Sequence, residues 1–284
     1  FGQGIVQTDN DFGSQGIPPT HPRLLDWLAV EFMENLWSQK ELHRLLVTSA
    51  TYRQASLRRD DIDQIDPANK WLARQTRFRL DAELVRDLAL SASGMLRTKM
   101  GGPGVFPPQP EGCMDLGQHR KTWKASTGED RYRRAAYTYR WRNTPHPALK
   151  VFDAPDGLAA CTRRIRSNTP LQALTLMNDP AFIELAMGLA KRLLTEADTP
   201  EERIRLGFQL CLNRDPDADE LRLLHGMVQQ QTKDFAVQAN SAKAVVLRAA
   251  ALGQGTKPVG GDAAFSAWTM VARVLLNLDE TITR

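Results

Sequence analysis

Residues 161–174 read CTRRIRSNTPLQAL and place a basic stretch directly before a strong helix start. Thr169 is a good N-cap, and Pro170 suits the first helical position, where a backbone N–H is not needed. Gln172 completes a capping box, so we expect a helix from this point to about residue 194. The sequence therefore predicts that a loop containing three arginines leads into a helix.

Two further amphipathic helices are predicted near the start of the chain, followed by a third. Residues 20–32, THPRLLDWLAVEF, carry apolar side chains at helical spacing. The next segment, SQKELHRLLVTSATY, opens with a capping box formed by Ser38 and Glu41. Residues 77–94, RFRLDAELVRDLALSASG, repeat leucine every four residues and stop at Gly94, a residue suited to a left-handed helix end.

Helices are also predicted in the last third of the chain. Thr199, Pro200 and Glu202 form one start signal. Asp215 with Pro216 forms another. After a loop, GQGTKPVGG, an apolar stripe indicates a final helix; its residues are Phe265, Trp268, Val271, Leu275 and Leu278.

The middle of the chain differs from both flanks. Residues 100–112 contain eight Gly or Pro, which breaks regular structure. Residues 135–143, AAYTYRWRN, alternate aromatic and polar side chains with a period of two, which is typical of a half-buried strand. We predict a mainly α single domain over residues 1–284, with helical parts 20–98 and 168–284 and a small irregular β-containing insertion at 100–167.

Composition excludes several classes of protein. With 42% hydrophobic and 25% charged residues, the chain is globular, and no apolar run reaches the roughly 18 residues of a membrane span. The first thirteen residues, FGQGIVQTDNDFG, do not show the basic-then-apolar pattern of a signal sequence. Cys113, Cys161 and Cys211 form no CxxC or CxxCH pattern, and the five histidines form no HxxxH, so we expect neither haem nor zinc in this chain.

Charge is concentrated in the middle of the chain. Residues 120–166 hold twelve Lys or Arg and four acids, a balance of +8 within a total of +4. A helix start can bind an anion, and arginine pairs with sulfate or carboxylate in a bidentate manner. We therefore consider an anion site, whose residues would be Arg163, Arg164, Arg166 and Thr169, with Arg131, Arg133 and Arg134 if they fold nearby.

The alternative is that these arginines have a structural role. They would pair with acids and tie irregular loops to the helical body, and ion-pair networks of this kind resemble functional clusters. We favour this interpretation, while the +8 excess keeps the anion site open. The expected partners are Glu129, Asp130, Asp153 and Asp156.

Several long strings, taken in chain order, resemble the planctomycete-type PSD-one domain, a domain of unknown function (1553). They are DFGSQGIPPTHPRLLDWLAVEF, LVTSATYRQAS, TGEDRYRRAAYTYRW, FDAPDG, RRIRSNTPLQALTLMNDPAF and AWTMVARVLLNLDE. The resemblance implies the carboxy-terminal part of an exported bacterial protein with an upstream cytochrome c-like domain. Haem would then lie upstream, and the compartment would be the periplasm or the exterior. It implies no catalytic residues.

The combined expectation is a recognition or assembly module that contacts upstream domains of its polypeptide and binds an acidic or sulfated glycan. Aromatic faces stack on sugar rings while arginines take the acidic groups. Nucleic acid is not expected, because no nucleic-acid motif is present. The alternative is a hydrolase or oxidoreductase subunit acting on acidic polysaccharides, with His119, Glu129 and Asp130 as candidate acid–base groups; whether the chain is an enzyme is left open.

Overall fold

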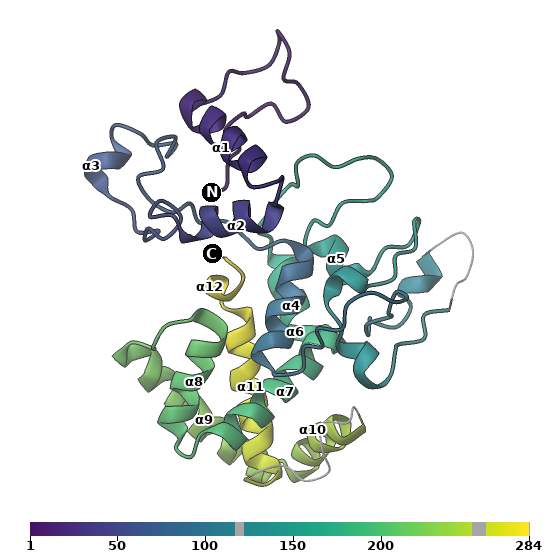
Figure 1. Cartoon of the computed structure of the whole chain (residues 1–284). Helices are drawn as coiled ribbons and strands as arrows, with labels where there is room; N and C mark the ends of the chain where they lie inside the picture. The colour runs from purple at the N-terminus through teal and green to yellow at the C-terminus, as the bar shows by residue number, and fades with distance from the viewer. Residues whose placement is uncertain (117–121, 252–259, 284) are drawn as a thin grey trace. The chain divides into compact units, whose positions relative to one another are not determined.

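The computed structural model describes residues 1–116, 122–251 and 260–283, which divide into two compact units (Figure 1). Unit 1 comprises Phe1–Phe78 together with Cys161–Arg163. Unit 2 comprises Arg79–Ala160 and Arg164–Thr283. The described residues form twelve α-helices and three short 3₁₀ helices, so the mainly α prediction is confirmed.

Unit 1 contains three helices and long irregular segments; a short turn joins the first two helices. They are α1 (Pro22–Glu34), α2 (Gln39–Thr48) and α3 (Asp60–Asp63). The hydroxyl of Ser38 accepts a hydrogen bond from the backbone N–H of Glu41 at 3.3 Å, as the capping box predicts. Unit 1 buries only two residues, Asp66 and Asn69, and neither is hydrophobic.

Unit 2 is a helical body with one long irregular insertion. Its helices are α4 (Ala82–Ala92), α5 (Pro147–Val151), α6 (Pro170–Asn178), α7 (Pro180–Glu196), α8 (Pro200–Leu212), α9 (Ala218–Val237), α10 (Ala239–Ala251), α11 (Asp262–Asn277) and α12 (Asp279–Ile282). The insertion lies between α4 and α6 and contains α5 and all three 3₁₀ helices; these are η1 (Cys113–Leu116), η2 (Gly128–Tyr132) and η3 (Ala135–Tyr137).

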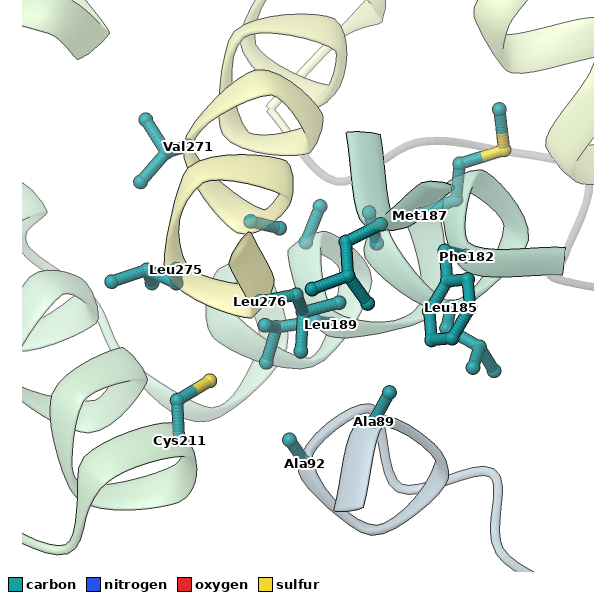
Figure 2. Close-up of a cluster of buried hydrophobic side chains, with 14 of the residues drawn as sticks. Ala89, Ala92, Phe182, Leu185, Met187, Leu189, Cys211, Val271, Leu275 and Leu276 are labelled. Atoms are coloured by element: carbon teal, nitrogen blue, oxygen red, sulfur yellow. The ribbon is translucent and has the colours of Figure 1, made fainter. Parts of the chain in front are cut away.

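The hydrophobic core of unit 2 is built around α11, which contacts α6, α7, α8, α9, α10 and α12. Phe265, Trp268, Val271 and Leu275 of the predicted apolar stripe are all buried. Figure 2 shows where side chains from α4, α7, α8 and α11 meet. Gly188 lets α7 approach the end of α4, because a Cβ there would lie 2.3 Å from the sulfur of Met95.

The helix predicted from residue 169 to about 194 is two helices. The chain breaks between α6 and α7 at Asp179, which ends the first helix and caps the second. The Asp179 carboxylate accepts from the backbone N–H of Ala181 at 2.8 Å. Pro180 is the physical reason, because proline lacks the N–H that a continuous helix needs and forces the preceding residue out of the helical conformation.

Other predicted boundaries lie close to those observed. The helix predicted at 77–94 is α4, followed by Gly94 with a φ of +72°. Thr199 and Glu202 form a reciprocal capping box on α8. The next helix starts at Ala218, after an Asp217 cap, rather than at Asp215 and Pro216. Most of the predicted loop at 253–261 falls outside the described residues.

The prediction of a β-containing insertion is wrong. The described residues of the insertion form two isolated bridges, Arg97 with Arg133 and Val105 with Thr138, and no strand. Pairing stops because Pro107 and Pro108 follow Val105 closely and have no N–H to donate. Of the aromatic residues that suggested a strand, Tyr137 ends the 3₁₀ helix η3, and Tyr139 and Trp141 follow it.

Candidate functional site

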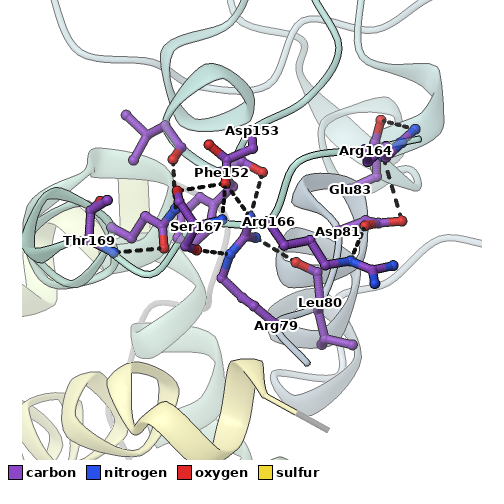
Figure 3. A network of polar contacts seen from close by, with 12 residues as sticks. Arg79, Leu80, Asp81, Glu83, Phe152, Asp153, Arg164, Arg166, Ser167 and Thr169 are labelled. Atoms are coloured by element: carbon purple, nitrogen blue, oxygen red, sulfur yellow. Dashed lines mark hydrogen bonds and ion pairs between the residues drawn. The ribbon is translucent and has the colours of Figure 1, made fainter. Parts of the chain in front are cut away.

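The arginine stretch that precedes α6 is bound to the amino end of α4 (Figure 3). The Arg164 guanidinium donates to both carboxylate oxygens of Glu83, at 2.6 and 3.3 Å. Arg166 donates through Nε to Asp81 at 3.2 Å, and Asp81 also lies 3.8 Å from Arg164. Both arginine side chains are about one third exposed. Their guanidinium groups therefore face carboxylates of α4 rather than the acids that the sequence suggested.

Arg79 is the centre of a second network, which sequence reasoning missed. Its guanidinium is buried and donates to the carbonyls of Ser167, Leu80 and Phe152 and, at 2.6 Å, to the Asp153 carboxylate (Figure 3). Burial acts to raise the pKa of Asp153, but hydrogen bonds from Ser167 and the charge of Arg79 outweigh it and hold that pKa below its ordinary value. This network joins the chain before α4 to the loop before α6.

Thr169 and Gln172 occupy the start of α6. The Gln172 side-chain oxygen accepts from the backbone N–H of Thr169 at 3.4 Å. Its amide group donates to the carbonyl of Val151 and to the hydroxyl of Ser167. The predicted cap is therefore part of the same polar network as Arg79.

The arginines of η2 and its flanks are held by α4 and α7. Arg131 forms a bidentate pair with the buried Glu184 at 2.8 and 2.6 Å, and the Tyr132 hydroxyl donates to the same carboxylate at 2.7 Å. Arg134 pairs with Asp87 at 3.2 Å. These contacts tie the insertion to the helical body.

Arg133 and Arg86 are buried, and neither guanidinium forms an ion pair with a carboxylate in the part of the chain that the structure describes. The Arg133 guanidinium stacks on the ring of Tyr137, 3.9 Å from its centroid, and donates to the carbonyls of Pro103, Lys99 and Gly101. Arg86 donates to the carbonyls of Arg131 and Arg133, and burial lowers its pKa to about 10. Each guanidinium shapes the insertion by binding backbone oxygens.

Arg163 differs from the other arginines in the predicted set. It belongs to unit 1, is exposed and lines a cleft of about 220 Å³ with residues of the N-terminal segment. Within the described residues its guanidinium makes no ion pair. Within unit 2, the other arginines of the predicted set contact different partners and do not surround one open position.

The candidate acid–base group is only partly described. Glu129 forms an exposed ion pair with Arg97 at 3.3 Å, and Asp130 is exposed. His119 lies outside the described residues. No cluster of three potential metal ligands occurs in the part of the chain that the structure describes.

A partly exposed aromatic cluster lies in the insertion. The ring of Phe106 stacks on Tyr139 at a centroid distance of 4.9 Å and meets the edge of Trp123 at 5.1 Å. Trp141 meets Tyr139 at 5.2 Å. Three exposed cations adjacent in sequence to these aromatic residues make no ion pair within the described residues; they are Lys124, Arg140 and Arg142.

The helices α1 and α2, with the turn between them, form what we call the N-terminal helix pair. Leu24, Leu25, Trp27, Val30 and Met33 on α1 are between 39% and 48% exposed. A cleft of about 300 Å³ lies between the two helices. The pair therefore presents apolar side chains to solvent over much of α1.

The turn of the N-terminal helix pair has an unusual backbone. Leu36 and Trp37 have φ values of 54° and 59°, a left-handed conformation that costs bulky side chains about 1–2 kcal/mol per residue. Their side chains are 88% and 64% exposed. Sequence reasoning predicted both helices but missed this turn, because nothing in Asn-Leu-Trp-Ser signals a left-handed conformation.

The chain matches the model of a known protein family. The family model PSD1, described as a protein of unknown function (DUF1553), matches residues 1–228, so the chain belongs to this family. Searches of curated proteins and of solved structures found no match. None of the described helices is both long enough and apolar enough to cross a membrane.

Proposed function

We propose that this member of the DUF1553 family is a recognition or assembly module of an exported multidomain protein, and that its N-terminal helix pair docks against another domain of the same polypeptide. The observation that carries the proposal is the absence of any buried hydrophobic side chain in residues 1–78. Folding depends mainly on burying apolar surface. A segment that exposes its apolar helices gains that burial by binding to a partner surface.

The left-handed turn supports this role. Strained backbone usually persists where the surroundings or a partner hold it, and it clusters at binding sites. Leu36 and Trp37 project from the turn as the most exposed apolar side chains of the N-terminal helix pair. Large aromatic side chains of this kind often dominate the binding energy of interfaces.

Hydrogen exchange tests the proposal directly. Amide exchange of residues 22–48 is measured in the 284-residue chain and in the full polypeptide encoded by its gene. We expect at least tenfold slower exchange in the full polypeptide, while α9, whose Leu223 is 70% exposed, keeps its rate. Equal exchange of residues 22–48 in both proteins would contradict the proposal.

A matched pair of substitutions in the full polypeptide localises the contact. Trp37→Glu places a charge in the proposed interface, and Leu223→Glu places one on the exposed face of α9. We expect Trp37→Glu alone to restore fast exchange in residues 22–48. Restoration by both variants, or by neither, would show that the turn does not make the contact.

Acidic-glycan recognition is a second candidate, favoured by one specific observation. The aromatic cluster of Phe106, Trp123, Tyr139 and Trp141 offers partly exposed rings, and nearby cations are not used in ion pairs within the described residues. Aromatic rings with adjacent guanidinium groups suit sugars that carry sulfate or carboxylate groups. The ligand would then contact Arg140 and Arg142 rather than the arginines that are paired with α4 and α7.

Calorimetric titration with heparin tests this second candidate, with uncharged dextran as the control ligand. We expect heparin affinity to fall at least about a hundredfold when Arg140 and Arg142 are both changed to alanine, since each charge-assisted hydrogen bond contributes about 1.5–3 kcal/mol. The double variant of Arg205 and Arg222, both of which form exposed helical ion pairs, is the matched control. No binding of heparin, or equal losses in both double variants, would contradict the candidate.

A further inference from the structure

A small cavity lies between α4, α7 and the insertion, whose helix α5 lines part of it. Its volume is about 10 Å³, measured as the room for the centre of a water molecule. Three of its lining residues are polar, Arg86, Thr138 and His146, and the other seven are apolar. One water molecule needs a volume of about this size.

Each of the three polar residues has one buried atom without a hydrogen-bond partner among the described residues. These atoms are Arg86 Nε, Thr138 Oγ1 and His146 Nδ1. Arg86 is 7% and His146 is 3% exposed. A buried polar atom without a hydrogen-bond partner destabilises the fold, so three such atoms around one cavity point to a shared partner.

The other nitrogen of His146 fixes the chemistry of the partner. His146 Nε2 lies 3.1 Å from the carbonyl oxygen of Pro108, which can only accept, so Nε2 carries the proton. Nδ1 of the neutral ring therefore presents a lone pair and needs a donor. Burial, with a smaller effect of Arg86, lowers the pKa of His146 to about 4, which keeps the ring neutral near pH 7.

Arg86 imposes the opposite requirement. Its Nε–H can only donate, and the other guanidinium nitrogens already bind the carbonyls of Arg133 and Arg131. The occupant must therefore accept from Arg86 and donate to His146. An anion such as chloride cannot donate, and a metal cation would lie beside a guanidinium.

We propose that a single water molecule occupies this cavity, accepting a hydrogen bond from Arg86 Nε, donating one to His146 Nδ1 and sharing one with the Thr138 hydroxyl. The water joins α4 to two separate parts of the insertion. It would fix the insertion where backbone pairing is limited to the isolated bridge between Thr138 and Val105.

A high-resolution crystal structure of the 284-residue chain, grown with bromide as the only halide, tests the proposal. We expect density for one water within about 3.2 Å of all three atoms, without anomalous signal. An empty cavity overturns the proposal, and so does an anomalous bromide peak at this position.

Substitutions of Thr138 provide a test in solution. Thr138→Val removes the hydroxyl while keeping the shape of the side chain, and we expect the melting temperature to fall by about 2–4 °C. Thr138→Ser keeps the hydroxyl and serves as the matched control, with the water retained in its crystal structure. A valine variant as stable as the serine variant contradicts the role of the hydroxyl, and the wild-type density then decides whether the water is present.

Discussion

Helices α1 and α11 have similar amphipathic sequences but very different surroundings. Nine residues of α11 are buried in the core of unit 2, whereas α1 has no buried residue. Each helix contains one tryptophan, yet Trp268 is 2% exposed and Trp27 is 47% exposed. An apolar stripe thus predicts that a helix face should be covered, but the surface that covers it must be found in the structure or in a partner.

The largest expected effect comes from replacing the tryptophan of each helix. Trp268→Ala should lower the free energy of unfolding by about 4 kcal/mol, because it leaves a cavity in a packed core. Trp27→Ala in the 284-residue chain should cost less than about 1 kcal/mol, because Trp27 is already half in water. Urea unfolding followed by circular dichroism measures both. Similar losses in the two variants would show that unit 1 has a core of its own.

Ion pairs provide a second comparison between buried and exposed positions. Glu184→Ala removes the buried partner of Arg131 and should cost about 3 kcal/mol, because it strands a mostly buried guanidinium. Glu201→Ala breaks the exposed pair with Arg205 and should cost about 0.5 kcal/mol or less. Thermal melts at low and high salt separate the two, and a strong salt dependence for Glu184 would contradict its burial.

Lowering the pH should reduce the stability of unit 2, because His146 titrates. The folded-state pKa of about 4 lies below the unfolded value of about 6.5, so the unfolded chain binds a proton more readily between these values. The stability from the neutral ring is complete above pH 6.5 and is lost as pH falls toward 4. Between pH 7.5 and 5 we expect a loss of about 2 kcal/mol.

The His146→Phe variant is the control for this pH dependence. It keeps a ring in the same aromatic surroundings but removes the titrating group. We expect the difference in free energy of unfolding between wild type and variant to narrow as pH falls from 7.5 to 5. A constant difference would mean that His146 does not supply the pH dependence.

Much of the helical framework could be predicted from local sequence. Ser38, Thr199 and Gly94 mark helix ends through contacts or backbone angles within a few residues of each boundary. The insertion could not be predicted in this way, because its shape depends on Arg86, Arg131 and other long-range contacts with α4 and α7. Alternating aromatic residues suggested a strand, but a strand needs a paired strand. Prolines in the neighbouring segment lack the N–H groups that such pairing requires.

The arginine partners show the same limit. The structural interpretation considered acids within or beside the basic segment, whereas Arg164 and Arg166 pair with Asp81 and Glu83, more than 80 residues away in the chain. Arg79, beside those acids in the sequence, was overlooked although it holds Asp153. An acidic first turn in a predicted helix was the available signal, because it is a natural partner for arginines that approach the helix start.

A further small effect concerns Arg164, where the two interpretations of the basic stretch predict different results. Its guanidinium faces Glu83 and Asp81 and is about one third exposed, so Arg164→Ala should cost about 0.5–1 kcal/mol of stability. If Arg164 also serves an anion site, the variant should weaken sulfate binding by about tenfold. Calorimetric titration with sulfate and thermal melts, on Arg164→Ala and on Arg163→Ala as the control, separate these results. A lowered melting temperature with unchanged sulfate binding means that Arg164 holds the loop to α4. Weakened sulfate binding with an unchanged melting temperature means that the carboxylates release the guanidinium to a ligand, which would contradict the structural role.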